Sequence, residues 1–214
     1  MAARIQTTPR KSASQARSRA TVDALIEATA RILVTEGFDT ASTNKIARLA
    51  GVGIGSLYQY FPNKEALVGA VVDRHKEETM QVVRLALAKA AGRPIAETLR
   101  VLVQVGIDAH RINPKLHRVL SEQIPRVGRL ENVQAIGRET FALVRAYLDA
   151  HREDLAVQDT QLAAFVCATT VEALTHAAVV DRPDALNEIE AERLVDEVSL
   201  LLTRYLLKGE GVGS

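Results

Sequence analysis

The first regular feature of the sequence is a helical spacing of apolar residues that starts near Arg19. From about residue 19 to residue 36, apolar positions and one threonine recur at steps of three and four: Val22, Leu25, Ile26, Thr29, Ile32 and Leu33. This spacing is typical of one face of an amphipathic helix. Gly37 follows, where a helix often ends on a left-handed residue. The pattern predicts a first helix over 19–36.

The same kind of pattern continues along the chain. Two short helical stretches are predicted at about 43–50 and 53–60, and Asn63 is a plausible N-cap for a long helix that reaches about Ala90. Later helical stretches, separated by breaks such as Asn113-Pro114, are predicted at about 95–112, 114–122, 129–151, 159–180 and 186–207. Because there is no alternating strand pattern and no internal repeat, we predict an all-α protein of about nine helices.

Charge divides the chain into a basic head and an acidic body. Residues 1–64 contain nine Lys/Arg and four acidic residues, a net charge of +5, whereas the remaining residues carry a net charge of −4. This asymmetry suggests that only the head meets a polyanion, although chance clustering is the alternative. The composition, 47% hydrophobic and 25% charged, is that of an ordinary soluble protein.

Composition and motifs also suggest domain limits. Residues 1–17 are polar, basic and free of acids, and we expect them to form a disordered arm. The basic residues of the arm, and Arg19 just after it, are predicted either to follow a polyanion or to act as a solubilising tail: Arg4, Arg10, Lys11, Arg17 and Arg19. A small basic domain is predicted over 18–64, and a larger acidic helical domain over 65–214.

The sequence favours a cytoplasmic protein. Cys167 is the single cysteine, so an internal disulfide is impossible and a reducing compartment is expected. Its apolar neighbours suggest a buried small hydrophobe rather than a redox sensor. No apolar run approaches the roughly 18 residues that span a bilayer, and no apolar segment follows the basic N-terminus. We therefore expect no membrane association.

The motifs of common enzyme classes are missing. The sequence has no glycine-rich phosphate loop, HExxH pair, GxSxG elbow or Cys/His cluster. His110 and His117 are seven residues apart, but Asn113-Pro114 interrupts the helix between them and no third ligand has a recognisable spacing. We predict no enzyme activity, no cofactor and no metal site. An active site assembled only in three dimensions and a helical scaffold protein remain alternatives.

Residues 43–61 carry the most specific pattern. Ala47 supplies a small residue where two short helices cross, and Gly51 supplies the turn between them. Five positions are spaced to face a core: Ile46, Ala50, Val52, Leu57 and Tyr60. Seven positions are expected to face outward: Thr43, Asn44, Ile54, Gly55, Ser56, Tyr58 and Gln59. A helix-turn-helix places the second helix in the DNA major groove; a hairpin that packs only on itself is the alternative.

These residues resemble the signature of the tetracycline-repressor (TetR) family over about residues 19–70. The resemblance rests on Ile46-Ala47, Ala50-Gly51-Val52, Gly55, Leu57-Tyr58, Tyr60-Phe61 and Asn63-Lys64-Glu65-Ala66-Leu67. It implies an N-terminal three-helix DNA-binding domain and a larger C-terminal helical domain. It further implies a repressor that binds a palindromic operator as a homodimer and is released by a small molecule. An activator or dual regulator remains an alternative.

The resemblance also implies roles for single residues. Thr43, Tyr58 and Lys64 are expected to contact phosphates, which positions the protein without reading sequence. Asn44 is expected to reach a base, and the recognition positions are Ile54, Gly55, Ser56, Gln59 and Tyr60. Gln59 would pair with an adenine edge and Ile54 would touch a thymine methyl. Spacing alone points Tyr60 partly inward, so a core position is its alternative. Gly53 and Gly55 weaken the helix by about 1 kcal/mol each relative to alanine, which suggests a close approach of backbone to DNA.

The last two predicted helices, about 159–180 and 186–207, carry long apolar stripes. For the body, the resemblance implies an effector pocket between the middle helices and a dimer interface in these last two helices. Packing of the stripes entirely inside the monomer is the alternative. The candidate pocket residues are polar positions on apolar helices, each with a core-edge or solvent position as its alternative: Gln104, Asp108, His110, His117, Gln123, Tyr147, Cys167 and Thr170. The low aromatic content of the body favours an aliphatic or acyl effector.

Overall fold

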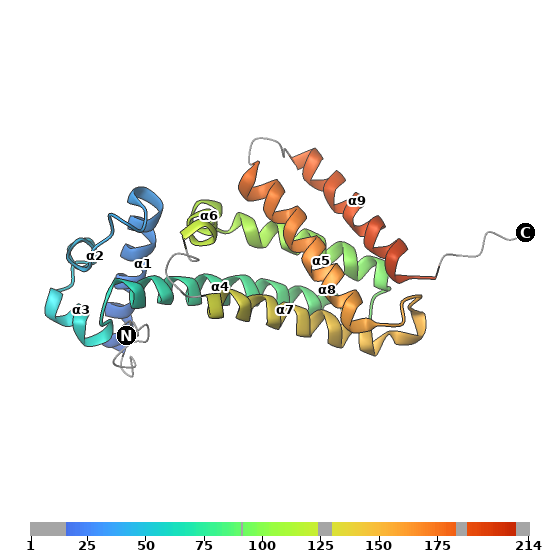
Figure 1. Ribbon diagram of the computed structural model, residues 1–214, viewed down its shortest axis with the longest axis horizontal. Helices are drawn as coiled ribbons and strands as arrows, with labels where there is room; N and C mark the ends of the chain where they lie inside the picture. Colours follow the sequence, from blue (N-terminus) through green and yellow to red (C-terminus); the bar gives the residue numbers. More distant parts are fainter. Residues whose placement is uncertain (1–15, 91, 124–129, 183–187, 209–214) are drawn as a thin grey trace, which may run out of the picture. The chain divides into compact units, whose positions relative to one another are not determined.

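The computed structural model describes residues 16–90, 92–123, 130–182 and 188–208, and within them the protein is all-α (Figure 1). The prediction of an all-α fold is therefore confirmed. Its helices are α1 (Ala16–Glu36), α2 (Thr43–Ala50), α3 (Ile54–Tyr60), α4 (Lys64–Ala90), α5 (Ile95–Arg111), α6 (Pro114–Gln123), α7 (Leu130–Ala150), η2 (Arg152–Asp154), α8 (Thr160–His176), η3 (Ala177–Asp181) and α9 (Glu188–Leu206).

Two helix ends differ from the predicted ones by three residues or more. α1 begins at Ala16 rather than near Arg19, and most of the predicted arm, residues 1–15, lies outside the described residues. α8 ends at His176, and the chain continues as one turn of π-helix to Asp181. The predicted stretch 159–180 therefore corresponds to two consecutive elements.

The helix ends follow from local chemistry. Gly37 and Gly51 have φ angles of 80° and 65°, a region that side-chain-bearing residues rarely adopt, and each follows a helix that ends beside it. At the start of α2 the Ser42 hydroxyl accepts a hydrogen bond from the backbone N–H of Lys45. At the start of α4 the Asn63 side chain accepts one from Ala66 N at 2.8 Å, which confirms Asn63 as a cap.

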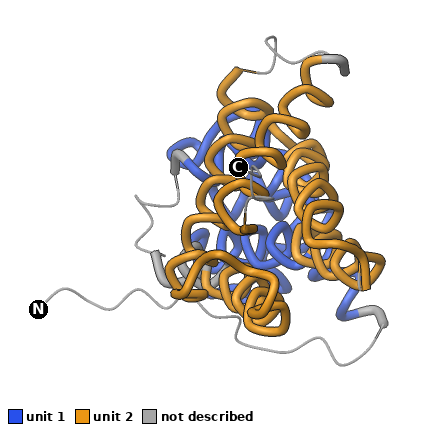
Figure 2. The backbone as a smooth tube through the Cα atoms, turned by 90° about the vertical axis from the view of Figure 1, so that its right-hand side faces the viewer, with its two compact units in different colours: residues 1–77, 115–132 blue, residues 78–114, 133–214 orange. Residues whose placement is uncertain are grey.

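The chain forms two compact units (Figure 2). The first contains residues 1–77 and 115–132, and the second contains residues 78–114 and 133–214. The division falls inside α4 and not at the predicted limit between residues 64 and 65. In the first unit, α1, α2, α3, the start of α4 and α6 share one core, which includes Leu25, Leu33, Ile46, Leu57, Phe61, Leu67 and Leu120.

In the second unit, α5 packs against both α8 and α9 (Figure 1). Its core combines residues of these helices with α7 and the segment that follows it, including Val103, Ile107, Leu148, Leu155, Cys167, Val198 and Leu202. Ion pairs add links between helices: Arg84 of α4 with Glu139 of α7, and Arg100 of α5 with Asp196 of α9. Exposed pairs of this kind contribute little to stability, so burial of the apolar side chains holds the unit together.

The continuous helical segment Thr160–Asp181 is long and apolar enough to cross a membrane by length and composition alone. The expectation that no apolar run approaches this length was therefore too strict. Ala163, Ala164 and Cys167 of this segment are buried in the core of the second unit, while Leu162 and Phe165 are exposed. A core helix of a soluble protein has the same composition, because one face packs inward and another apolar face remains available.

Candidate functional site

The pair of helices α2 and α3 is held in place by a small set of buried side chains. Ile46, Ala47 and Leu57 are buried in the core of the first unit. The turn between the helices is closed by a hydrogen bond from Val52 N to Ala47 O at 2.9 Å. Ala50 and Val52 are partly buried against the same core. The predicted inward positions therefore face inward, and the arrangement is that of a helix-turn-helix.

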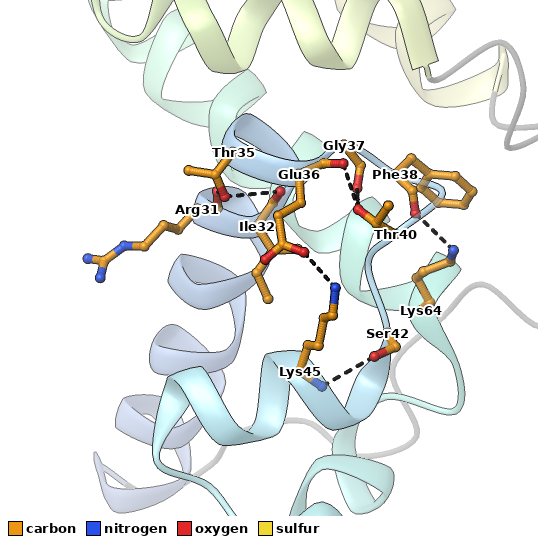
Figure 3. Close-up of polar contacts among 10 residues, drawn as sticks. All are labelled: Arg31, Ile32, Thr35, Glu36, Gly37, Phe38, Thr40, Ser42, Lys45 and Lys64. Atoms are coloured by element: carbon orange, nitrogen blue, oxygen red, sulfur yellow. Dashed lines mark hydrogen bonds and ion pairs between the residues drawn. The ribbon is translucent and has the colours of Figure 1, made fainter.

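Polar contacts fix α2 relative to the end of α1 (Figure 3). Lys45 Nζ lies 2.6 Å from Glu36 Oε2, and the Thr40 hydroxyl donates to the Glu36 carbonyl oxygen at 2.6 Å. From the start of α4, Lys64 Nζ donates to the Phe38 carbonyl oxygen at 2.9 Å and lies 4.0 Å from the centroid of the Phe38 ring. These contacts join α1 to α2, and they join the loop between the two helices to α1 and α4.

The outward positions of α2 and α3 are exposed, except for Thr43, which is half-buried. Asn44, Ser56 and Gln59 are exposed, and so are Ile54 and Tyr58. The hydroxyl of Thr43 on α2 and the hydroxyl of Tyr58 on α3 lie 3.0 Å apart and are hydrogen bonded to each other. The two hydroxyls that were predicted to contact phosphates therefore lie side by side.

Two residues that were predicted to contact DNA, Tyr60 and Lys64, contact other parts of the protein instead. Tyr60 is only 8% exposed and belongs to the core of the first unit. This agrees with the alternative that its spacing left open, so we leave Tyr60 out of the DNA-contacting set. The Lys64 ammonium is engaged with Phe38, which gives it a structural role that the sequence did not indicate.

The glycines near the start of α3 have no internal reason to be glycine. A Cβ atom added at Gly53 or Gly55 would meet no other heavy atom within 4 Å, and neither residue has a positive φ angle. Neither α2 nor α3 contains an acidic residue, and Arg48 on α2 is exposed. The exposed face is thus free of negative charge and open to close approach, as a phosphate-rich surface requires.

The candidate effector residues have different surroundings. Gln104 donates to Asp108 on the surface of α5 at 3.0 Å, and His117 is hydrogen bonded to His75 at 3.0 Å within the first unit. Cys167 is buried in the core of the second unit, and Thr170 is partly buried. The side chain of Gln123 lies outside the described residues.

His110 and Cys167 have shifted pKa values. Burial lowers the pKa of His110, but its contacts with the carboxylate of Glu172 and the carbonyl of Gly106 outweigh this effect, so the pKa is raised above its ordinary value. Burial raises the pKa of the Cys167 thiol to about 11. Because the thiolate is the reactive form, this favours the predicted role of Cys167 as a small core residue.

Two buried hydroxyls of the second unit lack a hydrogen-bond partner within the described ranges. One is the Tyr147 hydroxyl of α7, which the sequence suggested, and the other is the Thr98 hydroxyl of α5, which it did not. Buried polar atoms nearly always form hydrogen bonds, so these two hydroxyls are candidate partners for a water molecule or a ligand. Thr98 lies within an apolar helical stretch, and no sequence signal singled it out.

α8 and α9 also carry an exposed apolar face. Leu162 and Phe165 of α8 are 55% and 58% exposed, and Leu201 of α9 is 55% exposed. Leu174 and Leu200 are also exposed. Exposed large apolar side chains on neighbouring elements often mark an association surface. The predicted stripe on the last two helices thus divides into buried residues, such as Ala163 and Leu202, and exposed ones.

Comparison with known proteins identifies both parts of the chain. Residues 25–71 match the family model described as "Bacterial regulatory proteins, tetR family". Residues 94–206 match the model described as "Tetracyclin repressor-like, C-terminal domain", which covers more than half of the chain.

Single relatives are distant. The chain is 22% identical over 116 residues to the HTH-type transcriptional regulator SAR0097 of Staphylococcus aureus, which is 54% of this chain and 61% of that protein. A TetR-family regulator of Mesorhizobium loti superposes with a TM-score of 0.69 at 21% identity and covers 91% of this chain and 100% of that one. The SmeT–triclosan complex superposes with a TM-score of 0.67 at 20% identity and covers 91% and 95%. The match of both domain models over most of its length shows that the chain belongs to the TetR family of transcriptional regulators.

Proposed function

We propose that the protein is a one-component repressor that binds a palindromic operator as a homodimer and leaves it when a small-molecule effector binds. The observation that carries the proposal is the exposed face of α2 and α3, which is free of acidic residues and includes the Thr43–Tyr58 hydroxyl pair. The family supplies the general role of transcriptional regulation. As a DNA-binding regulator of this family, the protein would act in the cytoplasm.

Contacts with DNA would divide into two kinds. Thr43 and Tyr58 would hold phosphates, because paired hydroxyls already fixed at 3.0 Å need little reordering to meet a phosphate oxygen. The exposed side chains near and along α3 would face base edges in the major groove, with Gln59 on an adenine and Ile54 on a thymine methyl. Asn44, Gly55 and Ser56 complete the proposed set. Lys64 would also contact a phosphate, but more weakly than Thr43 and Tyr58, because its ammonium is shared with the Phe38 carbonyl.

Dimerisation would use the exposed apolar face of α8 and α9. Two helices from each subunit would make a four-helix interface, in which Leu162, Phe165 and Leu201 of one protomer are covered by the other. A two-fold dimer presents two α3 helices, and this symmetry is what a palindromic operator matches.

The effector would bind in the second unit, which makes up most of the predicted domain over 65–214. The buried hydroxyls of Tyr147 and Thr98 support this proposal, because a ligand with a polar group would complete their hydrogen bonding. SmeT, which has the same fold, has been solved in complex with triclosan. Release from DNA requires that the effector bind better to a conformation in which the two DNA-binding units are wrongly spaced for the operator.

The test is a binding measurement on the purified protein with the DNA that flanks its own gene. We expect a dimer that prefers a palindromic site over random duplex, with an affinity that falls steeply between two salt concentrations. Gln59→Ala should relax the preference at one or two base pairs, whereas equal loss at all sequences would refute its base-reading role. If a sample refolded free of ligand shows no preference for this DNA over random duplex, the protein has no operator beside its own gene.

A further inference from the structure

Three potential metal ligands from two helices gather in the second unit. They are His110 of α5 and Glu172 and His176 of α8, and their ligand atoms all lie within 4.8 Å of one another. His110 Nε2 is 3.4 Å from Glu172 Oε1, and the two imidazole rings have centroids 5.5 Å apart. No metal site was predicted from the sequence, because His110 lies far along the chain from Glu172 and His176.

The fold explains why these side chains meet. Glu172 and His176 are four residues apart on α8 and so lie on the same face of that helix. Gly106 lies one turn before His110 on α5, and a Cβ atom there would come within 3.0 Å of Val171 Cγ1 and 3.2 Å of the Thr175 side chain. The glycine thus permits a close approach of α5 to α8, which brings His110 to the carboxylate.

His110 is also oriented as metal-binding histidines are. Its Nδ1 lies 2.6 Å from the Gly106 carbonyl oxygen, which can only accept a hydrogen bond, so Nδ1 carries the proton. The lone pair of the neutral ring is therefore on Nε2, the atom that faces Glu172. A backbone carbonyl that fixes the tautomer in this way is a common outer contact of metal-ligating histidines.

We propose that His110, Glu172 and His176 bind a divalent transition-metal cation, of which Zn²⁺ is the model. Two imidazoles and one carboxylate suit this class, whereas Mg²⁺ and Ca²⁺ prefer sites made of oxygen ligands. Three protein ligands of this kind can hold a zinc ion. The Asp181 carboxylate lies 3.7 Å from His176 Nε2 and adds a second negative charge beside the proposed site.

The site needs only a small contraction to close on a metal ion. Ligand atoms bound to tetrahedral zinc at about 2.0–2.1 Å lie about 3.3 Å apart. The Glu172 side chain is 66% exposed and can change rotamer at little cost, whereas His110, at 4% exposed, is already fixed. A rigid buried histidine and two more accessible ligands from a neighbouring helix thus make a site that solvent metal ions can reach.

The test is a titration of the full-length, tag-free, chelator-treated protein with Co²⁺ alone, followed by competition with Zn²⁺. We expect one Co²⁺ per chain, with visible absorption bands of a low-coordinate ion that Zn²⁺ abolishes. Glu172→Gln and His176→Asn should each weaken binding by about 100-fold or more, since even outer-contact substitutions cost about 10–100-fold. Both residues are accessible, so circular dichroism should show an unchanged fold.

His151→Asn is the matched control. The ring of His151 also contacts a carbonyl four residues earlier, at 2.9 Å from Tyr147 O, but His151 is not part of the ligand group. This variant should bind Co²⁺ as the wild type does. The proposal is overturned if the wild type binds no Co²⁺, if Glu172→Gln and His176→Asn leave affinity unchanged, or if His151→Asn weakens it equally. The titration contains no DNA, so its result is independent of the proposed repressor function.

Discussion

Gly55→Ala tests whether the backbone of α3 approaches DNA closely. Gly55 is the second residue of α3, and the added methyl group would meet no other heavy atom within 4 Å. Its φ angle is not positive, so alanine fits without strain. Alanine in a helix is favoured over glycine by about 0.5–1 kcal/mol. The free energy of unfolding of the first unit should therefore increase by about this amount.

DNA binding should change in the opposite direction. If the Gly55 backbone lies against the major-groove edges, the methyl group must push α3 away from the bases. A loss of about tenfold in operator affinity corresponds to about 1.4 kcal/mol, and we expect at least this much. A more stable protein that binds more weakly cannot be explained by unfolding.

The assay combines thermal unfolding with fluorescence anisotropy on operator and random duplexes at one salt concentration. Thr35→Ala is the matched control, because Thr35 is an exposed residue of α1 whose replacement also favours the helix. It should leave operator affinity unchanged. If Gly55→Ala gains stability and binds the operator as tightly as the wild type, close backbone approach is the wrong explanation for this glycine.

Four further predictions follow from single contacts. Tyr58→Phe removes one hydroxyl of the Thr43–Tyr58 pair and should weaken binding to all DNA sequences by about 3–10-fold without changing the salt dependence of the affinity. Tyr205→Phe on α9 is the control and should bind DNA as the wild type does. A loss that depends on the DNA sequence would contradict the phosphate role of Tyr58. Lys64→Met should lower the free energy of unfolding, measured by denaturant titration, by about 1–2 kcal/mol, because it removes a charged donor to the Phe38 carbonyl. If stability is unchanged and only the salt dependence of DNA affinity is reduced, Lys64 acts as a phosphate contact only. Leu162→Glu or Leu201→Glu should convert the dimer to a monomer, as measured by light scattering. Leu85→Glu, at an exposed position of α4, is the control and should leave the dimer intact. If the Leu162→Glu and Leu201→Glu variants both remain dimers, the interface lies elsewhere. With a pKa of about 11, Cys167 should be a thiolate in roughly one molecule in a thousand at pH 8. Labelling of the thiol should therefore be at least 100-fold slower in the native protein than in the denatured protein. Comparable labelling rates would show that the thiol is not buried.

Much of the fold could be predicted from the sequence because its signals are local. The three- and four-residue spacing around Leu25 and Ile32 marks a helix wherever it occurs, and Gly37 and Gly51 end helices through their own backbone conformations. The exposed positions of α3 were predicted for the same reason, since helical spacing decides which side chains oppose the buried Leu57.

Other features depended on contacts between residues far apart in the chain. Tyr60 could face inward or outward by spacing, and packing in the first unit buried it. Lys64 meets the carbonyl of Phe38, 26 residues away, and no pattern near either residue indicates that bond.

The division between sequence and structure is clearest at His110. The sequence alone determined the helices, the helix-turn-helix and the basic head, because each is encoded by neighbouring residues. Only the tertiary structure brought His110 together with Glu172 and His176, through the close approach of α5 and α8 at Gly106. The physical reason is that helical periodicity fixes the direction of a side chain from its own helix, whereas the partner helix is selected by packing of the whole core.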